Sequence, residues 1–255
     1  MNQIRFYVKN DPLAEGRIGM VAQNRMEKRR QREEMILDAA GELIAEVGFF
    51  ELKMSDLARA CDISVGTLYG HFASKEDLLI GLAVMAGAKR ADKFDIARNH
   101  DGSAIEKYII ANLLDLSFSI DNPQLFEAEY LALAPSVWKR ATPARHQAQL
   151  DQINAITTMF QTFLTEGEDE LGIASDMTSR SRNLNLGSWG LGYGINVLVL
   201  SEITDRHYGQ ELRKNALGIL CDGLADLMIG AGWQVDDARE KVRALAVTYA
   251  SASAL

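Results

Sequence analysis

Residues 54–80, MSDLARACDISVGTLYGHFASKEDLLI, form the stretch that most constrains how this chain can fold. The run MSDLARA predicts a short helix that turns Leu57, Ala58 and Cys61 inward, and the CDI that follows interrupts it. Ser64 is a residue type that caps helices, so VGTLYGH is expected to form a second short helix. Two short helices joined by a tight turn are typical of a helix-turn-helix.

Longer helices are predicted on both sides of this pair. The upstream run RMEKRRQREEMILDAAGELIAEVG ends at Gly48, the residue type that most readily adopts the left-handed backbone of a helix stop. Downstream, Ser74 followed three residues later by Asp77 is a helix-start signal, and the helix is expected to run through LLIGLAVMAGAKRADKF and to link two domains. The upstream helix carries one apolar stripe, formed by Ile36, Ala39, Ala40, Leu43, Ile44 and Val47.

The rest of the chain continues the helical pattern. Amphipathic stretches lie at about 104–119, 123–133, 144–165, 178–201, 209–229 and 236–250. No run shows the sustained alternation of a strand, so the sequence predicts an all-α fold. We expect a small three-helix domain with the helix-turn-helix at residues 25–80 and a larger helical domain at residues 81–255. Residues 1–24 lack sustained periodicity and are predicted to form a flexible or partly ordered arm, whose contact with DNA stays open.

Composition excludes several classes of protein. The chain of 255 residues has a formal net charge of −8, which argues against a protein that coats nucleic acid but is compatible with a local basic patch. Its two cysteines, Cys61 and Cys221, lie far apart with no His cluster, so no disulfide framework, metal site or other cofactor is predicted. No apolar run is long enough to cross a membrane, and the N-terminus lacks the pattern of a signal peptide. We therefore expect a cytoplasmic protein.

The helix-turn-helix also has the residue order of a known family. The run ILDAAGELIAEVGF, followed by SDLARACDISVGTLYGHFASKEDLL, resembles the DNA-binding domain of the tetracycline-repressor (TetR) family of bacterial transcription regulators over roughly residues 28–80. The resemblance implies that the second short helix enters the major groove of DNA while the first braces it across the backbone. It also implies a homodimer, a palindromic double-stranded DNA operator, and a small-molecule effector that releases a repressor from that operator.

The predicted DNA contacts follow from the same motif. The residues that the resemblance places on phosphates are Thr67, Tyr69 and Lys75. Those that it places at or near the bases are Ser64, Val65, Gly66 and His71. Gly66 and Gly70 each lower helix propensity by about 1 kcal/mol relative to Ala, a cost that is understandable if they permit close approach to a phosphate backbone.

Three positions depart from the family's pattern. Val65 stands where a Lys or Arg is frequent, so an apolar contact to a thymine methyl is the natural replacement. Asp62 stands where a Gly is usual in the turn, and Asp tolerates unusual backbone angles better than most residues. Lys53 replaces a capping Thr; it cannot cap a helix but can reach a phosphate. These changes leave the operator sequence open.

Two other stretches allow more than one interpretation. The basic run before the first helix-turn-helix element either contacts phosphates or is a solvated helix face; it comprises Arg25, Lys28, Arg29, Arg30 and Arg32. The run LGSWGLGYG at 186–194 fits neither a nucleophile elbow nor a dinucleotide-binding loop. Since no set of nucleophile, base and acid is visible, the chain is not predicted to be an enzyme.

Two further sites are predicted in the larger domain. The candidate dimer interface combines small and apolar residues of the last long helices: Gly187, Gly190, Gly194, Leu217, Leu220, Cys221, Leu224, Leu227 and Met228. The candidate effector pocket comprises Trp138, Phe160, Phe163, Trp189 and Tyr193. For both sets the alternative is ordinary core packing. A protein partner in place of a small-molecule effector also stays open, as do the effector, the regulated genes and the direction of regulation.

Overall fold

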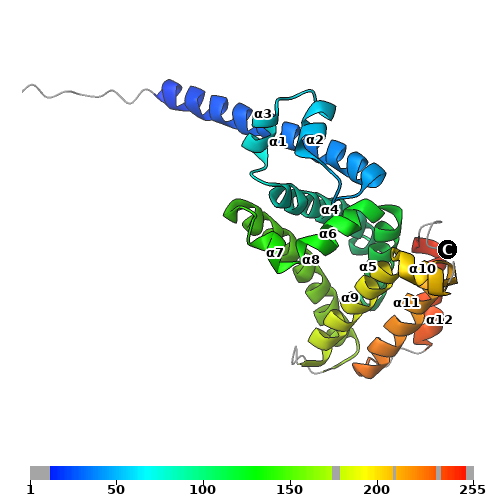
Figure 1. The fold of residues 1–255 in the computed structure, drawn as a ribbon. Coiled ribbons are helices and arrows are strands. Elements are labelled where there is room, and N and C mark those ends of the chain that lie inside the picture. Colours follow the sequence, from blue (N-terminus) through cyan, green and yellow to red (C-terminus); the bar gives the residue numbers. More distant parts are fainter. Residues whose placement is uncertain (1–11, 174–178, 209–210, 234–236, 251–255) are drawn as a thin grey trace, which may run out of the picture. The chain divides into compact units, whose positions relative to one another are not determined.

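The structure is a computed structural model that describes residues 12–173, 179–208, 211–233 and 237–250, and in these ranges it contains helices and no strand. The helices, drawn in Figure 1, are α1 (Pro12–Val47), α2 (Met54–Ala60), α3 (Val65–His71), α4 (Lys75–Arg98), α5 (Ala104–Asp121), α6 (Pro123–Ala132), α7 (Pro135–Trp138), α8 (Pro143–Glu170), α9 (Ser179–Val199), α10 (Glu202–Tyr208), α11 (Glu211–Gly230) and α12 (Ala238–Tyr249). The all-α prediction is confirmed. The chain divides into two compact units, with the boundary between Phe72 and Ala73.

The first unit contains α1, α2 and α3. Helix α1 ends before Gly48, whose φ of +80° is the left-handed conformation expected of a glycine stop. All three helices and the turn after α1 contribute buried apolar side chains: Ile36, Leu37, Ala40, Ile44, Phe49, Leu52, Leu57 and Leu68. Helix α2 packs on both α1 and α3, which confirms the predicted helix-turn-helix.

Helix α1 begins earlier than the sequence predicts. The flexible arm was expected at residues 1–24, but residues 12–24 form the first turns of α1, while residues 1–11 lie outside the described residues. Pro12 stands at the first helical position, where its missing N–H would have no partner in any case. Gly16 and Gly19 interrupt the apolar periodicity on which the expectation rested, yet each costs only about 1 kcal/mol within a helix.

The second unit contains α4 to α12, with α5 at its centre. Helix α5 packs against α4, α8, α9, α11 and α12. Its start is fixed by a capping box, in which Ser103 Oγ accepts a hydrogen bond from the Glu106 amide at 3.2 Å and Glu106 Oε2 accepts one from the Ser103 amide at 2.9 Å. Because α4 packs within this unit, the boundary lies before α4 and not at residue 80, where it was expected.

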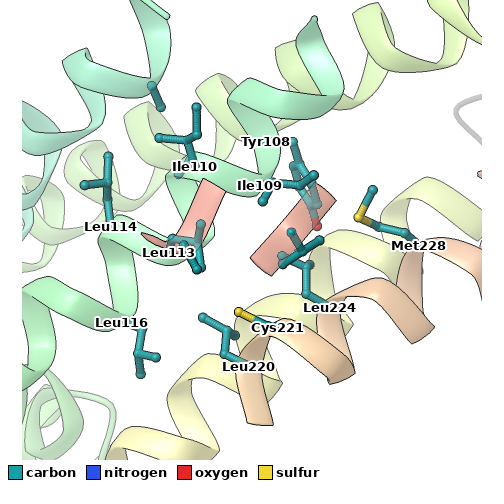
Figure 2. Close-up of a cluster of buried hydrophobic side chains, with 14 of the residues drawn as sticks. Tyr108, Ile109, Ile110, Leu113, Leu114, Leu116, Leu220, Cys221, Leu224 and Met228 are labelled. Atoms are coloured by element: carbon teal, nitrogen blue, oxygen red, sulfur yellow. The ribbon is translucent and has the colours of Figure 1, made fainter. Parts of the chain in front are cut away.

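The apolar stripe of α11 faces the core of its own chain. The predicted interface residues in this core are Leu217, Leu220, Cys221, Leu224 and Met228, each at most 8% exposed. Figure 2 shows the last four against side chains of α5, among them Tyr108 and Leu113. Leu227 is partly buried against the same core. This corrects the predicted dimer interface, since these side chains are already covered within one chain.

The three predicted interface glycines on α9 differ from one another. A Cβ added at Gly187 would lie 3.0 Å from Leu227 Cδ2, so Gly187 lets α9 approach α11 within the chain. No described atom lies within 4 Å of the corresponding position at Gly190 or Gly194. Those two positions are open and remain accessible to a second chain.

Candidate nucleic-acid interface and ligand cavity

The turn between α2 and α3 is built as the sequence predicts. Asp62 has a φ of +51°, a left-handed conformation that Asp tolerates, and the Ile63 amide donates to the Ala58 carbonyl oxygen at 3.0 Å. Ser64 then caps α3, because its Oγ accepts a hydrogen bond from the Thr67 amide at 3.0 Å. The predicted cap and the predicted strain tolerance of Asp62 are both confirmed.

Helix α3 presents most of its length to solvent. Leu68 is 0% exposed and anchors the helix, whereas Val65 and Tyr69 are 42% and 47% exposed. A Cβ added at Gly66 or Gly70 would meet no described atom nearer than 3.8 Å. One face of α3 is therefore anchored in the core by Leu68. The opposite face is accessible to solvent, and at Gly66 and Gly70 no side chain projects from it.

Helix α1 holds the C-terminal end of α3. The side chain of His71 is 8% exposed, and its Nδ1 lies 3.3 Å from Oε1 of Glu33. Arg29 Nη2 donates to the Gly70 carbonyl oxygen at 3.1 Å and also lies 3.1 Å from the Glu33 carboxylate. The structure thus places His71 against α1, away from the exposed face of α3, and makes Arg29 a brace for that helix.

The remaining residues that the sequence offers as phosphate contacts are lysines and arginines, and their surroundings differ. Lys53 is the exposed N-cap residue of α2 and makes no side-chain cap hydrogen bond, as expected. Lys75 is the first residue of α4 and belongs to the second unit. Arg30 pairs with Glu27 and Glu34, which is the solvated-face arrangement. The remaining exposed cations of the basic run are Arg25, Lys28 and Arg32.

A cavity of about 410 Å³ lies in the second unit, among α4, α5, α6, α8 and α9. This volume falls within the roughly 300–1,000 Å³ of sites that hold small organic ligands. Its apolar wall is formed by Leu133, Ile153, Ile156, Phe160, Leu186 and Trp189. On the α4 side, a Cβ added at Gly87 would lie 2.5 Å from Gln152 Cγ, so any larger residue here would require the Gln152 side chain to move.

The predicted effector residues separate into two groups. Phe160, Trp189 and Tyr193 line the cavity. Phe163 is 3% exposed in the core, and the ring of Trp138 stacks on His146 with centroids 4.5 Å apart; neither is a lining residue. Helical periodicity shows which side chains face inward, but it does not show which of them border empty space.

Three charged side chains meet in the cavity wall. Arg90 of α4 lies between Asp115 of α5, with Nε 3.1 Å from Oδ1, and Glu129 of α6, with Nη2 2.5 Å from Oε2. Burial raises the pKa of the Glu129 carboxyl to about 7, although the Arg90 charge acts in the opposite direction. Sequence reasoning missed this cluster. Its only signal was a charged residue at an inward-facing helical position, as with Arg90 and Asp115.

Three buried polar atoms in the same wall make no hydrogen bond to any described residue. They are Oε1 of Gln149, whose residue is 8% exposed, the phenol oxygen of Tyr193, and Nε of Arg90, which lies within ion-pair distance of Asp115. Burial and the negative charge of Glu129 raise the pKa of the Tyr193 phenol, which places it beside the charged cluster. A buried polar atom without a partner costs about 1–3 kcal/mol, so a ligand that supplies partners here is favoured.

Comparison with known proteins matches the last part of α1, the next two helices and the start of α4 to a known family. A family model described as "Bacterial regulatory proteins, tetR family" matches residues 36–82, which contain α2, α3 and the turn between them. Residues 36–82 of this chain therefore match the tetR family. The exposed, capped α3 is the second helix of the helix-turn-helix within this matched segment.

Relatives of known name extend the similarity. The fatty acid metabolism regulator protein of Bacillus subtilis (strain 168) is 40% identical over 57 residues, which are 22% of this chain and 29% of that protein. The matched segment thus spans less than a third of that relative's length. FadR from Bacillus subtilis in complex with stearoyl-CoA has a TM-score of 0.55 at 21% identity, over 75% of this chain and 97% of that chain. RolR in complex with resorcinol has a TM-score of 0.56 at 16% identity, over 85% and 95%.

The tetR family consists of transcriptional regulators, which agrees with the expectation that this chain is not an enzyme. Across the described residues, no group of three or more His, Cys, Asp or Glu side chains is arranged to hold a metal ion. None of the described helices is both long enough and apolar enough to span a membrane.

Proposed function

We propose that the protein is a cytoplasmic transcriptional repressor that binds a palindromic double-stranded DNA operator as a homodimer and leaves it when a small molecule binds. The exposed face of α3 carries the proposal: Leu68 anchors the helix, Arg29 braces its end, and Val65 and Tyr69 point outward. A recognition helix must be presented in this way to enter the major groove. The residues proposed to contact DNA are Lys53, Ser64, Val65, Gly66, Thr67, Tyr69, Gly70 and Lys75. His71 instead packs against Glu33 of α1 and positions α3.

A dimer is needed because one helix-turn-helix reads only a few base pairs, and two recognition helices about 34–36 Å apart span one turn of DNA. The open positions Gly190 and Gly194 lie one helical turn apart on α9, so they share a face. Leu198 on α9 and Ile219 on α11 are 49% and 40% exposed. This outer surface of α9 and α11, in place of the buried stripe, is the proposed interface.

The cavity is the proposed effector site. Helix α4 lines it with Gly87 and Arg90, and α4 is the helix that follows α3 in the chain. A ligand that touches Arg90 therefore touches the element that leads directly from the recognition helix. FadR with stearoyl-CoA and RolR with resorcinol show that proteins of this fold hold small molecules. A ligand that binds two arrangements of the protein with different affinity shifts the equilibrium between them.

Two measurements test the proposal. Affinity for DNA, followed by fluorescence anisotropy, should fall with salt with a log–log slope of about −0.9 per phosphate neutralised. A thermal-shift screen should find compounds that raise the melting temperature and weaken DNA binding. If no compound does either, the alternative is favoured in which the protein acts through a protein partner without an effector.

A further inference from the structure

The buried part of the cavity wall holds more negative than positive charge. Asp115 and Glu129 share a single guanidinium, that of Arg90, and the three side chains are 21%, 14% and 11% exposed. Arg182 also lines the cavity, but it is exposed to solvent, where water and salt screen its charge. With both carboxylates ionised, the cluster carries one uncompensated negative charge in a place where charge is costly.

The buried polar atoms beside this cluster that lack hydrogen-bond partners also favour one kind of ligand group over another. Oε1 of Gln149 is an acceptor that lacks a donor, and the Tyr193 oxygen can accept as well as donate. The remaining atom, Arg90 Nε, is a donor, but the Asp115 carboxylate already lies 3.1 Å from it. A ligand group that brings both N–H donors and positive charge satisfies the two oxygen atoms and the excess carboxylate together. A carboxylate ligand would instead face Asp115 and Glu129 with an Arg90 that is already paired.

The apolar wall indicates what such a group must be attached to. Phe160 and Trp189 offer aromatic surface, and Ile153, Ile156 and Leu133 extend it. A cation close to aromatic faces gains further attraction from their quadrupoles. From this wall, the buried carboxylates and the orphan acceptors, we infer that the cavity binds an organic cation, an ammonium group on an apolar or aromatic body. This inference rests on the proposed function, because it names the chemical class of the effector.

Binding of such a cation is coupled to a proton. The titratable groups that face Glu129 are Arg90 of α4, Asp115 of α5 and Tyr193 of α9. A bound ammonium keeps Glu129 ionised, so below a pH of about 7 binding must expel the proton that this carboxyl carries. Affinity for an amine should therefore rise about tenfold between roughly pH 6 and pH 8. A neutral ligand should show no such rise.

Three probes of matched shape test the inference by isothermal titration calorimetry on the full chain without DNA: naphthylmethylamine, naphthylmethanol and naphthoate. The amine should bind most tightly and naphthoate least. Equal or tighter binding of the alcohol or of naphthoate would overturn the inference, as would failure of the amine to bind at millimolar concentration.

Two variants locate the charge that is responsible. Glu129→Gln should weaken amine binding about tenfold and leave the alcohol unaffected. Glu127→Gln is the matched control, since Glu127 lies on the same helix but does not line the cavity, and it should bind the amine as the wild type does. Should Glu129→Gln not fold, Asp115→Asn provides the same comparison. A Glu129→Gln protein that binds the amine with unchanged affinity contradicts the assignment.

The two proposals can fail separately. An uncharged or anionic compound that releases the protein from DNA would overturn the cation assignment and leave the proposed function standing. An amine that binds with the expected pH dependence to a protein that does not bind DNA would support the cation site and contradict the proposed function.

Discussion

Arg90 on α4 and Glu129 on α6 are joined by an ion pair in the cavity wall, with Nη2 2.5 Å from Oε2. Arg90 also donates to Ser119 Oγ at 3.3 Å, and its guanidinium carbon lies 4.9 Å from the centroid of the Phe118 ring. These contacts tie the helix that follows α3 in the chain to α5 and α6. A ligand that forms an ion pair with Glu129 therefore weakens the contact between α4 and α6.

Glu129 should make stability depend on pH. Its pKa in the folded protein is about 7, above the ordinary value of 4.5, so the folded state binds this proton more tightly than the unfolded state does. The resulting stabilisation is present at low pH and is lost as pH rises toward 7. Relative to the wild type, Glu129→Gln should gain about 2–3 kcal/mol in the free energy of unfolding between roughly pH 5 and pH 8. Urea denaturation across that range measures the difference, and a flat difference contradicts the pKa assignment.

Lys53→Ala should remove one phosphate contact. Lys53 is exposed at the start of α2, the helix that braces the recognition helix. The log–log slope of DNA affinity against salt should become shallower by about 0.9. Lys139→Ala removes the same charge from an exposed residue of the second unit and should leave the slope unchanged. Equal effects of the two variants would argue against a contact at Lys53.

Gly70→Leu should weaken DNA binding about tenfold without loss of helix. The position is open within the chain, so leucine fits, and leucine is the better helix former by about 1 kcal/mol. The added side chain would stand between α3 and the phosphate backbone. Anisotropy and circular dichroism measure the two effects. Ala155→Leu, at an exposed position of α8, is the control and should bind DNA as the wild type does. If Gly70→Leu also binds DNA normally, the glycine has no role in close approach.

Gly194→Arg should give a folded monomer. The position is open within the chain, so the new side chain disturbs only a partner packed against α9. Ala155→Arg, at an exposed position of α8, should remain dimeric. Sedimentation velocity distinguishes the two forms, and a dimeric Gly194→Arg protein would rule out this face as the interface.

Leu224→Arg should behave differently from Gly194→Arg. Leu224 is 0% exposed, so an arginine there buries an unpaired charge in the core formed with α5. We expect an unfolded or insoluble protein, to be checked by circular dichroism. A soluble, folded monomer would instead indicate that this side of α11 is an interface after all.

Sequence alone predicted the features that local chemistry determines. Ser64 and Ser74 cap the helices that follow them, Gly48 ends α1, and Asp62 takes the left-handed backbone of the turn. Each of these outcomes depends on a residue and its neighbours within one turn of helix, so a single sequence contains the information.

Features that depend on packing between distant helices were not predictable. The stripe from Leu217 to Met228 has the same periodicity whether it faces α5 or a second chain, and only the fold shows that it faces α5. His71 sits in the recognition motif, yet Glu33 on α1 turns it inward. The cluster of Arg90, Asp115 and Glu129 unites three helices, and no spacing along the chain reveals such a meeting.

Whether α3 reads a palindromic operator can be tested by selecting bound duplexes from a random DNA pool with the purified protein. We predict enrichment of a palindrome whose half-site centres lie about 10 base pairs apart, or a multiple of a helical turn, with binding that weakens steeply as salt rises. Failure to enrich any sequence at low salt would contradict the assignment of α3 as a recognition helix.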